Sequence, residues 1–438
     1  MADLAGYRGS ALRFLRKARA SVGDVLEVTT DWGSISGTLV PRYEYDDDWH
    51  VVLKLPSGYN VGLDVSRLRT AKVKAKGEKP AFEPPPAPRS KAKLPRVLII
   101  GTGGTIASRV DYRTGAVRPA VSAGELYALI PELSEIARIE PEILFSIYSE
   151  NMEPLNWTKL ARRVARAVAE GVHGIVVTHG TDTLGYTAAA LSFALQGVPI
   201  PVVLTAAQRS SDRPSSDAAG NLIGAASVAA RASFSGVYVA MHLSESDDGI
   251  AIHRGTRVRK NHTSARDAFE SVGVPLAAVW RSSGLEQVDA SLPDRRGKAG
   301  YRAKARFEAR VALLKFYPSM PTLLIDNLRK AGTKAIVLEG SGLGHVNSRN
   351  IAAVRNFAAK GRLVFMTSQC INGRVDMNVY DTGRDLLAAG AIPLEDMLAE
   401  TALVKAMWVL GNSRNMDEAK KLMTKNLAGE MTPRTFRK

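Results

Sequence analysis

Two loops that combine glycine with threonine each follow a predicted buried strand. The first, residues 101–108, reads GTGGTIAS and carries the hydroxyls of Thr102 and Thr105. The second, residues 177–184, reads VTHGTDTL and places a hydroxyl directly before a carboxylate. In open α/β sheets, ligands bind beyond the carboxyl ends of the strands, which is where both loops fall. The two loops together predict a site built on threonine hydroxyls at one edge of a sheet.

Each loop has a plainer interpretation when it is taken alone. The first lacks the lysine of a P-loop, and Ile106 stands where a dinucleotide-binding GxGxxG loop needs a small residue. What remains is a glycine turn whose N–H groups approach a substrate while Thr102 and Thr105 present their hydroxyls. A lone turn of this kind is more often structural than catalytic. In the second loop, Asp182 could simply cap the following helix, but capping does not explain two such loops in one sheet.

Buried apolar runs alternate with amphipathic helices after residue 95, which indicates a parallel sheet with helices on both faces. One helix is expected over residues 156–170, where Leu160, Val164 and Val168 share a face. An S-x-x-E capping box at 122–125 indicates the start of another helix. The predicted strands cover residues 97–100, 175–177, 202–204, 237–241, 336–338 and 363–366.

The chain has 438 residues, which is enough for two or three globular domains. Residues 1–75 contain short β-type runs separated by turns, and they predict a small N-terminal β-barrel. The sequence does not rank a stabilising or oligomerising role of this domain against docking to RNA or protein. Residues 76–95 hold six prolines among several lysines, and this composition predicts a linker.

The net charge of +16 arises from 59 basic and 43 acidic side chains. Such a charge attracts polyanions, but a basic proteome or an ion-rich thermophile surface explains it equally well. The single cysteine, Cys370, rules out an internal disulfide, and we expect a small buried residue there. The seven histidines show no metal-binding spacing, so no metal is expected. No run of about 18 apolar residues is present, which predicts a soluble, cytoplasmic protein.

Both threonine loops resemble signatures of the L-asparaginase and L-glutaminase family. The family motifs TGGTIA and HGTDT occur intact at residues 102–107 and 179–183. A third family segment, KxxTxxxxAFxS, matches residues 260–271, and the substrate-gripping element matches Ser-Glu-Asn-Met at 149–152. The resemblance runs from about residue 96 to about residue 430.

This resemblance implies an α/β fold made of an asparaginase-like pair of parallel-sheet domains, preceded by the small N-terminal β-barrel. Residues 96–300 would form the catalytic domain of the pair, and residues 301–438 its C-terminal domain. The implied activity is the release of ammonia from a side-chain amide.

The catalytic residues implied by the resemblance are two threonines, an aspartate and a lysine. Thr105 would be the nucleophile, because a threonine hydroxyl attacks an amide only after a base takes its proton. Thr181, Asp182 and Lys260 would form a relay in which the lysine accepts that proton and the carboxylate orients it.

The resemblance also implies how the substrate is held. Ser149 and Glu150, together with the relay carboxylate, would bind its amino and carboxylate groups. Gly104 and Gly180 would let the backbone approach it, and backbone N–H groups of these loops would stabilise the oxyanion. Tyr112 is the tyrosine that could serve as the lid residue of the family.

Several further features resemble the D subunits of archaeal glutamyl-tRNA(Gln) amidotransferases. They are the N-terminal β region, the proline–lysine linker, the positive charge and the segments 373–380 and 426–430. In that family the D subunit hydrolyses L-glutamine and passes ammonia to an E subunit, which amidates Glu-tRNA(Gln) with ATP and Mg²⁺. The resemblance implies a homodimer of this chain within a heterotetramer, with no cofactor in this chain and no membrane.

Two alternatives stay open at this point. The chain could be a free-standing L-asparaginase or L-glutaminase of amino-acid catabolism, with an incidental N-terminal domain. It could also be an RNA-binding scaffold with a vestigial hydrolase site. The complete catalytic set argues against the scaffold, because a dead site should tolerate the loss of at least one member.

Overall fold

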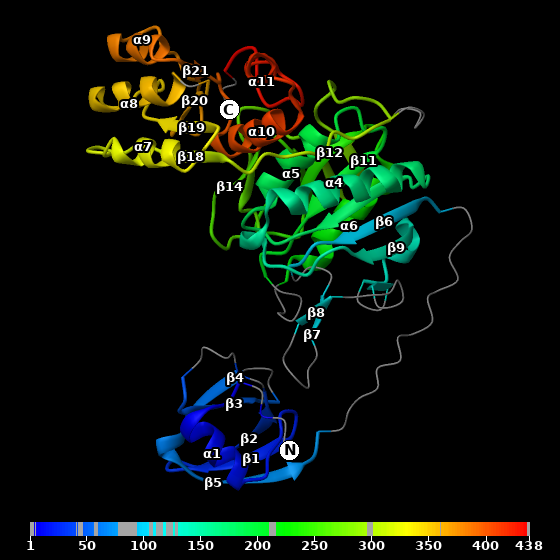
Figure 1. The fold of residues 1–438 in the computed structure, drawn as a ribbon. Helices are drawn as coiled ribbons and strands as arrows, with labels where there is room; N and C mark the ends of the chain where they lie inside the picture. Colours follow the sequence, from blue (N-terminus) through cyan, green and yellow to red (C-terminus); the bar gives the residue numbers. More distant parts are fainter. Residues whose placement is uncertain are drawn as a thin grey trace. The chain divides into compact units, whose positions relative to one another are not determined.

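The structure is a computed structural model, shown in Figure 1. The chain forms two compact units, residues 1–85 with 108–118 and residues 86–107 with 119–438. Most of the predicted linker and the predicted capping box at 122–125 lie outside the described residues. The structure describes residues 4, 6–40, 42, 47–56, 60–77, 94–104, 108–110, 117–119, 126–127, 130–209, 216–295, 301–359 and 361–435.

The N-terminal unit contains a five-stranded antiparallel sheet in the order β4-β3-β2-β1-β5. Leu26, Val28 and Leu53 point from the strands into one core, where Leu15 of the helix α1 joins them. The helix forms within the basic N-terminal stretch, for which no element was predicted from the sequence. The strands β4 and β5 lie at opposite ends of the hydrogen-bonded order, so closure into a barrel stays a prediction. The elements are α1 (Gly9–Lys17), β1 (Val25–Thr30), β2 (Ser34–Leu39), β3 (His50–Lys54), β4 (Asn60–Asp64), η1 (Val65–Arg67) and β5 (Leu68–Ala75).

An eight-stranded sheet forms the centre of the larger unit, in the order β17-β16-β13-β12-β11-β10-β6-β9. The five strands from β12 to β9 are parallel, and the remaining three are antiparallel. The strands predicted at 97–100, 175–177, 202–204 and 237–241 are confirmed as β6, β10, β11 and β12. The strands are β6 (Arg96–Gly101), β9 (Arg138–Ile143), β10 (Gly174–Thr178), β11 (Pro201–Thr205), β12 (Gly236–His242), β13 (Ile250–Arg254), β16 (Ala278–Arg281) and β17 (Gly284–Gln287).

Both faces of this sheet are buried, as continuous apolar strands predict. Ile175 and Val177 of β10 face a core shared with α4 (Pro154–Ala169) and α5 (Leu184–Ala194). Val176, which points the other way, faces a second core shared with α6. The short sheet of β14 (Val258–Lys260) with β15 (Phe269–Ser271) also belongs to this half, and its other described helices are α3 (Leu133–Ile136), η2 (Ser149–Asn151) and α6 (Ala218–Arg231). The pair of β7 (Ser108–Val110) with β8 (Val117–Pro119) falls almost entirely in residues 108–118, which are assigned to the other unit.

The helix predicted at 156–170 is confirmed as α4, which begins two residues earlier. Pro154 occupies its first turn, and Glu153 with Asn156 forms a capping box that sets the start. Gly171 follows the helix with a φ of 85°, a conformation that favours glycine and ends the run. The predicted face is the buried one, containing Leu160, Val164 and Val168.

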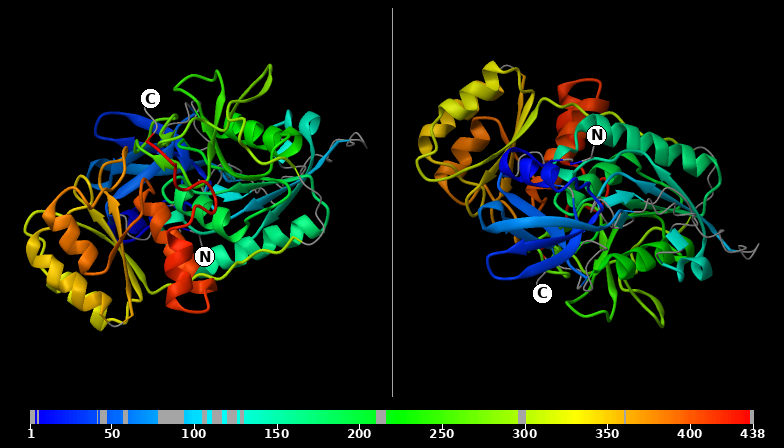
Figure 2. Two further views of the ribbon diagram at one scale, coloured as in Figure 1. Left: turned by 90° about the horizontal axis from the view of Figure 1, so that it is seen from above. Right: turned by 90° about the horizontal axis from the view of Figure 1, so that it is seen from below.

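The C-terminal part contains a four-stranded parallel sheet in the order β18-β19-β20-β21. The strands predicted at 336–338 and 363–366 are confirmed as β19 and β20. Helices α7 to α9 pack against one face of this sheet, and α10 packs against the other face and against α5 (Figure 2). The elements are β18 (Val311–Lys315), α7 (Leu323–Lys330), β19 (Ala335–Gly340), α8 (Ser348–Ala358), β20 (Leu363–Ser368), α9 (Asp381–Ala388), β21 (Ala391–Pro393), α10 (Ala399–Asn412) and α11 (Met416–Met423).

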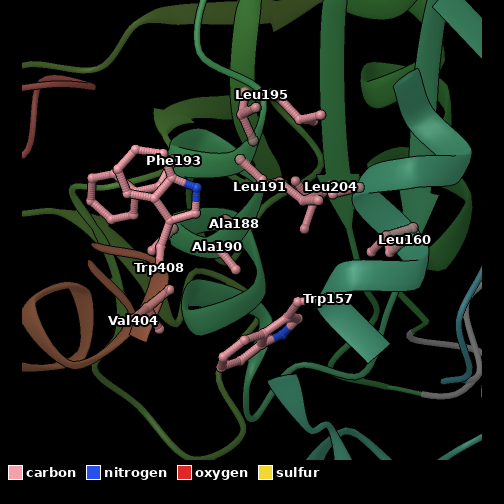
Figure 3. Close-up of a cluster of buried hydrophobic side chains, with 14 of the residues drawn as sticks. Trp157, Leu160, Ala188, Ala190, Leu191, Phe193, Leu195, Leu204, Val404 and Trp408 are labelled. Atoms are coloured by element: carbon pink, nitrogen blue, oxygen red, sulfur yellow. The ribbon is translucent and has the colours of Figure 1, made fainter. Parts of the chain in front are cut away.

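One apolar core joins the two halves of the larger unit. The rings of Phe193 in α5 and Trp408 in α10 stack with centroids 6.1 Å apart. Figure 3 shows this ring pair together with Leu191, Leu195 and Leu204 of the first half. Because interiors are close-packed, a shift of α10 is transmitted directly to α5, which begins at the second threonine loop.

Cys370 and the membrane prediction can also be compared with the structure. The expected burial of Cys370 is wrong: the residue is exposed, because it lies in the turn two residues beyond the end of β20, where its N–H binds Ser368 Oγ at 3.0 Å. Within the described ranges, no helix combines the length and the apolar character that crossing a bilayer requires.

Candidate active site

Lys260 contacts the second threonine loop directly. Its Nζ donates hydrogen bonds to Thr181 Oγ1 at 2.9 Å and to Asp182 Oδ1 at 2.8 Å. Lys260 is the last residue of β14, whereas Thr181 and Asp182 lie in the turn between β10 and α5. The lysine side chain is 15% exposed and the aspartate side chain 69% exposed, so the carboxylate of this ion pair is open to solvent. The structure thus brings together three of the four residues predicted for catalysis.

Gly104 and Gly180 allow three loops to approach one another at backbone distance. A Cβ atom on Gly104 would lie 2.5 Å from the carbonyl oxygen of His179, and the φ of Gly104 is +79°. A Cβ atom on Gly180 would lie 2.8 Å from Oγ of Ser149. Since a side chain at either position would collide with a neighbouring loop, glycine is required by the packing itself. The first loop, the second loop and the segment of Ser149 therefore meet at one place.

His179 holds the second loop through a buried hydrogen-bond network. Burial lowers the pKa of its imidazole to about 4, so the ring is neutral at pH 7. Its Nδ1 lies 2.7 Å from Gly180 O and must donate, because a carbonyl only accepts. Its Nε2, 2.9 Å from Thr187 Oγ1, then accepts, and that hydroxyl in turn accepts the Nε1–H of Trp157 at 3.0 Å. Every polar atom of the network has a partner, which keeps the loop rigid.

The predicted substrate-binding pair Ser149 and Glu150 lies in the short helix η2. Ser149 is buried and Glu150 is exposed. Thr183 donates its hydroxyl to Ser149 O at 2.6 Å, which attaches η2 to the second loop. Thr183 is also the N-cap residue of α5. The capping interpretation of Asp182 is therefore wrong, since its carboxylate pairs with Lys260.

The first loop differs from expectation at Thr102. Its side chain is 1% exposed, and its hydroxyl donates to Thr178 O at 2.8 Å rather than facing a substrate. The reason is its place directly beyond β6, where the hydroxyl reaches the end of the neighbouring strand β10. Thr105, the predicted nucleophile, and Tyr112, the predicted lid residue, lie outside the described residues.

A cavity of about 230 Å³ lies beside the lysine and is lined by Asp182, Lys260 and residues 261–263. Its lining residues carry a lysine nitrogen, a carboxylate, an amide, an imidazole and one hydroxyl, all of which suit a polar ligand. Within the described part of the chain, no three His, Cys, Asp or Glu side chains gather as metal ligands do.

The supporting residues of the site were not predicted from the sequence. His179 stands inside the HGTDT motif, but nothing in the motif indicates that its ring is buried and neutral. The spacing of Thr183 and Thr187, one helical turn apart, was a usable signal, because such residues share a face of α5. The contact of Trp157 with Thr187 depends on the packing of two helices and has no signal in the sequence.

Comparison with known families defines the class of protein. Residues 96–290 match the family model "Asparaginase, N-terminal", and residues 310–423 match "Glutaminase/Asparaginase C-terminal domain". The thermostable L-asparaginase from Thermococcus kodakarensis is 35% identical, with a TM-score of 0.68, and covers 77% of this chain and 99% of its own. The larger unit is thus an enzyme fold of the asparaginase type, and the predicted pair of asparaginase-like domains is confirmed.

The comparisons also cover the N-terminal region. Residues 20–73 match the model "GatD N-terminal domain". The D subunit of the glutamyl-tRNA(Gln) amidotransferase from Metallosphaera sedula is 48% identical over 98% of this chain and 97% of its own, and that from Pyrococcus abyssi is 47% identical over 96% and 97%. The chain belongs to the family of glutamyl-tRNA(Gln) amidotransferase D subunits.

Proposed function

We propose that this chain hydrolyses the side-chain amide of L-glutamine and supplies the ammonia to a partner subunit that converts Glu-tRNA(Gln) to Gln-tRNA(Gln). The single observation that supports the chemistry best is the lysine that donates to both Thr181 and Asp182. A primary amide is a poor electrophile, so its cleavage needs an activated nucleophile, and a lysine in contact with the hydroxyl of the second loop can serve as the base.

In the proposed reaction, the hydroxyl oxygen of Thr105 attacks the carbonyl carbon of the amide. Its proton passes through the hydroxyl of Thr181 to Nζ of Lys260, while Asp182 keeps that nitrogen oriented. The proton then moves to the amide nitrogen, the C–N bond breaks, and ammonia leaves. Water hydrolyses the threonyl ester to release glutamate and regenerate the hydroxyl.

The remaining roles concern binding. Ser149 and Glu150, together with Asp182, hold the amino and carboxylate groups of the substrate, and backbone N–H groups of the glycine turn and of Thr181 stabilise the developing oxyanion. Tyr112 is proposed as the lid residue.

The proposed division of labour places ATP and Mg²⁺ in an E-type partner. It is supported by the likeness to D subunits over 96–98% of this chain, whereas the similar L-asparaginase covers only 77%. The assembly proposed is a homodimer of this chain within a cytoplasmic heterotetramer that binds Glu-tRNA(Gln). The runner-up function is a free-standing L-asparaginase or L-glutaminase.

Purification from the native cell separates these two functions. The proposed assembly should bring down a second polypeptide of roughly similar size, and the complex should form Gln-tRNA(Gln) from Glu-tRNA(Gln), L-glutamine and ATP. The chain alone should form none, since its sequence has no phosphate-cradling motif. Recovery of the chain without a partner, with full amidase activity toward free amino acids, would favour the runner-up.

A further inference from the structure

The strand that carries Lys260 is not part of the central sheet. Among the described strands, β14 pairs only with the short β15. The two residues that precede β14, Thr256 and Arg257, are each only 1% exposed. The groups packed around these two residues therefore help to fix the position of Lys260.

Arg257 is enclosed by groups from the C-terminal half of the chain. Its Nη1 donates to Asp396 O at 2.7 Å and to Glu430 O at 3.4 Å, and its Nη2 pairs with the Asp396 carboxylate. The same carboxylate accepts the backbone N–H of Thr432 at 2.9 Å. A buried charge is tolerated only when it is paired and hydrogen-bonded, so moving the guanidinium away from these acceptors would cost free energy. The acceptors therefore hold it in one place.

Other contacts attach the same segment to the same region. Thr256 Oγ1 donates to Ala428 O at 3.0 Å, and Thr256 O accepts the hydroxyl of Thr401 at 2.9 Å. Arg259, the residue directly before Lys260, forms an ion pair with Glu400 at 3.2 Å. Residues 256–259 are thus bound to the loop before α10, to α10 and to the C-terminal segment 426–432.

The C-terminal segment is itself fixed by a buried ion pair. The Glu430 carboxylate accepts the N–H groups of Leu427 at 2.9 Å and Ala428 at 2.6 Å, which closes a tight turn. Lys405 of α10 pairs with the same carboxylate at 2.5 Å, and both side chains are fully buried. Lys405 also donates to the carbonyl oxygen of Met423 at 2.9 Å. The carbonyls presented to Thr256 and Arg257 are therefore anchored to α10.

We infer that Arg257 is a positioning residue for the reaction: clamped by Asp396 and the segment 426–432, it sets the distance from Lys260 to Thr181. This inference rests on the proposed role of Lys260 as the proton acceptor. It assigns the C-terminal segment a part in glutamine hydrolysis, although none of the predicted catalytic residues lies there.

The test is a double-mutant cycle on the full chain, with ammonia release from L-glutamine as the readout. Arg257→Met should lower kcat about 10- to 100-fold with little change in KM, since a displacement of about 1 Å in a catalytic group costs that much. In a Lys260→Met background, Arg257→Met should cause no further loss, because residues that act through one another are not additive. Arg257→Lys, which keeps the charge, should recover part of kcat.

Arg295→Met is the matched control. Arg295 is also partly buried and donates to the backbone carbonyls of Ala232, His173 and Ala229, all of which lie outside the strand pair β14–β15. Its loss should lower stability, with equal small effects on kcat in both backgrounds. If Arg257→Met reduces kcat by the same factor with and without Lys260, or behaves as Arg295→Met does, the inference is overturned.

A second variant covers a failure of Arg257→Met to fold. Thr256→Val removes the hydrogen bond to Ala428 O at nearly constant volume. This variant should show the same loss of kcat as Arg257→Met and the same non-additivity with Lys260→Met. Additive losses of kcat would contradict the inference. If Lys260→Met alone hydrolysed glutamine as fast as the parent protein, the proposed relay itself would be refuted. Failure of the proposed function and failure of the inference about Arg257 therefore give different results.

Discussion

Lys260 Nζ lies 2.9 Å from Thr181 Oγ1, although 79 positions separate the two residues in the chain. The same nitrogen is 2.8 Å from Asp182 Oδ1. One lysine nitrogen thus contacts a hydroxyl and a carboxylate at once, so removing any of the three groups changes the surroundings of the other two.

The first prediction concerns this relay. Thr105→Ala, Thr181→Ala and Lys260→Met should each lower ammonia release by at least about 10²-fold, because each removes the nucleophile or a member of the proton path. Steady-state kinetics with glutamine, together with thermal melting to confirm folding, checks this. Thr205→Val serves as the control: it deletes a buried hydroxyl at the end of the next strand, which donates to Ala240 O, and should leave the rate near that of the parent. Parent-like rates and pH dependence in Lys260→Met would show that another base acts.

The second prediction concerns the buried pair Lys405–Glu430. Lys405→Met leaves the Glu430 carboxylate buried without its counter-ion and should destabilise the larger unit by about 3–5 kcal/mol. Adding Glu430→Gln should restore part of this loss, because the uncompensated charge is gone. Urea unfolding gives the measurement, and Lys74→Met, which breaks an exposed pair with Glu27, should leave the midpoint unchanged. Equal midpoints for Lys405→Met and the parent would contradict the prediction.

The third prediction concerns pH and stability. Burial lowers the pKa of His253 from 6.5 to about 4. Between these values the unfolded chain binds more protons than the folded one, so stability is complete above about pH 6.5 and is lost as the pH falls toward 4. The contribution of this one group between pH 7 and pH 5 is about 2 kcal/mol.

His253→Gln tests this directly, since glutamine can still bind the hydroxyl of Ser271, which lies 2.9 Å from His253 Nδ1, but does not titrate. Urea unfolding at pH 7 and at pH 5 should show a smaller difference for the variant than for the parent. An unchanged difference would mean that other groups carry the pH dependence.

The fourth prediction concerns the positive charge and tRNA. We expect lysines and arginines of the N-terminal region to contact tRNA phosphates. Deletion of residues 1–95 from the assembled complex should then reduce the slope of log tRNA affinity against log salt concentration, by about one unit for each lost contact. Glutamine hydrolysis should persist. An unchanged slope would show that this charge serves another purpose, such as docking to the partner. The candidate contacts are Arg8, Arg13, Arg16, Lys17, Arg19, Lys72, Lys74 and Lys76.

Local patterns in the sequence were sufficient to predict six strands of the larger unit and the helix α4. The apolar runs at 97–100 and 175–177 form β6 and β10. A strand in which every side chain is apolar is most stable when both of its faces are buried, as they are in a parallel sheet covered by helices. The motifs also indicated the two loops, because positions where one backbone packs closely against another require glycine, and these glycines are recognisable in the sequence. The helix α1 was overlooked because its charged residues hid the periodic burial of Ala11 and Leu15.

Local sequence patterns did not predict whether individual side chains are buried or exposed. Thr102 and Cys370 occupy similar places just beyond strands, yet one is buried against Thr178 and the other is exposed. The difference comes from the neighbouring element: the strand beside Thr102 presents a carbonyl to it, whereas the turn that holds Cys370 is left uncovered.

The sequence by itself determined the identity of the reactive groups and the strand that precedes each threonine loop, because both depend on residues close together in the chain. It did not predict β14, the strand that carries Lys260. Only the tertiary structure decided which groups meet. The contact of Lys260 with Thr181, the neutral state of His179 and the enclosure of Arg257 by Asp396 and Glu430 each require segments far apart in sequence to pack together. Distances and desolvation of this kind follow from the close packing of the whole interior, which no local pattern records.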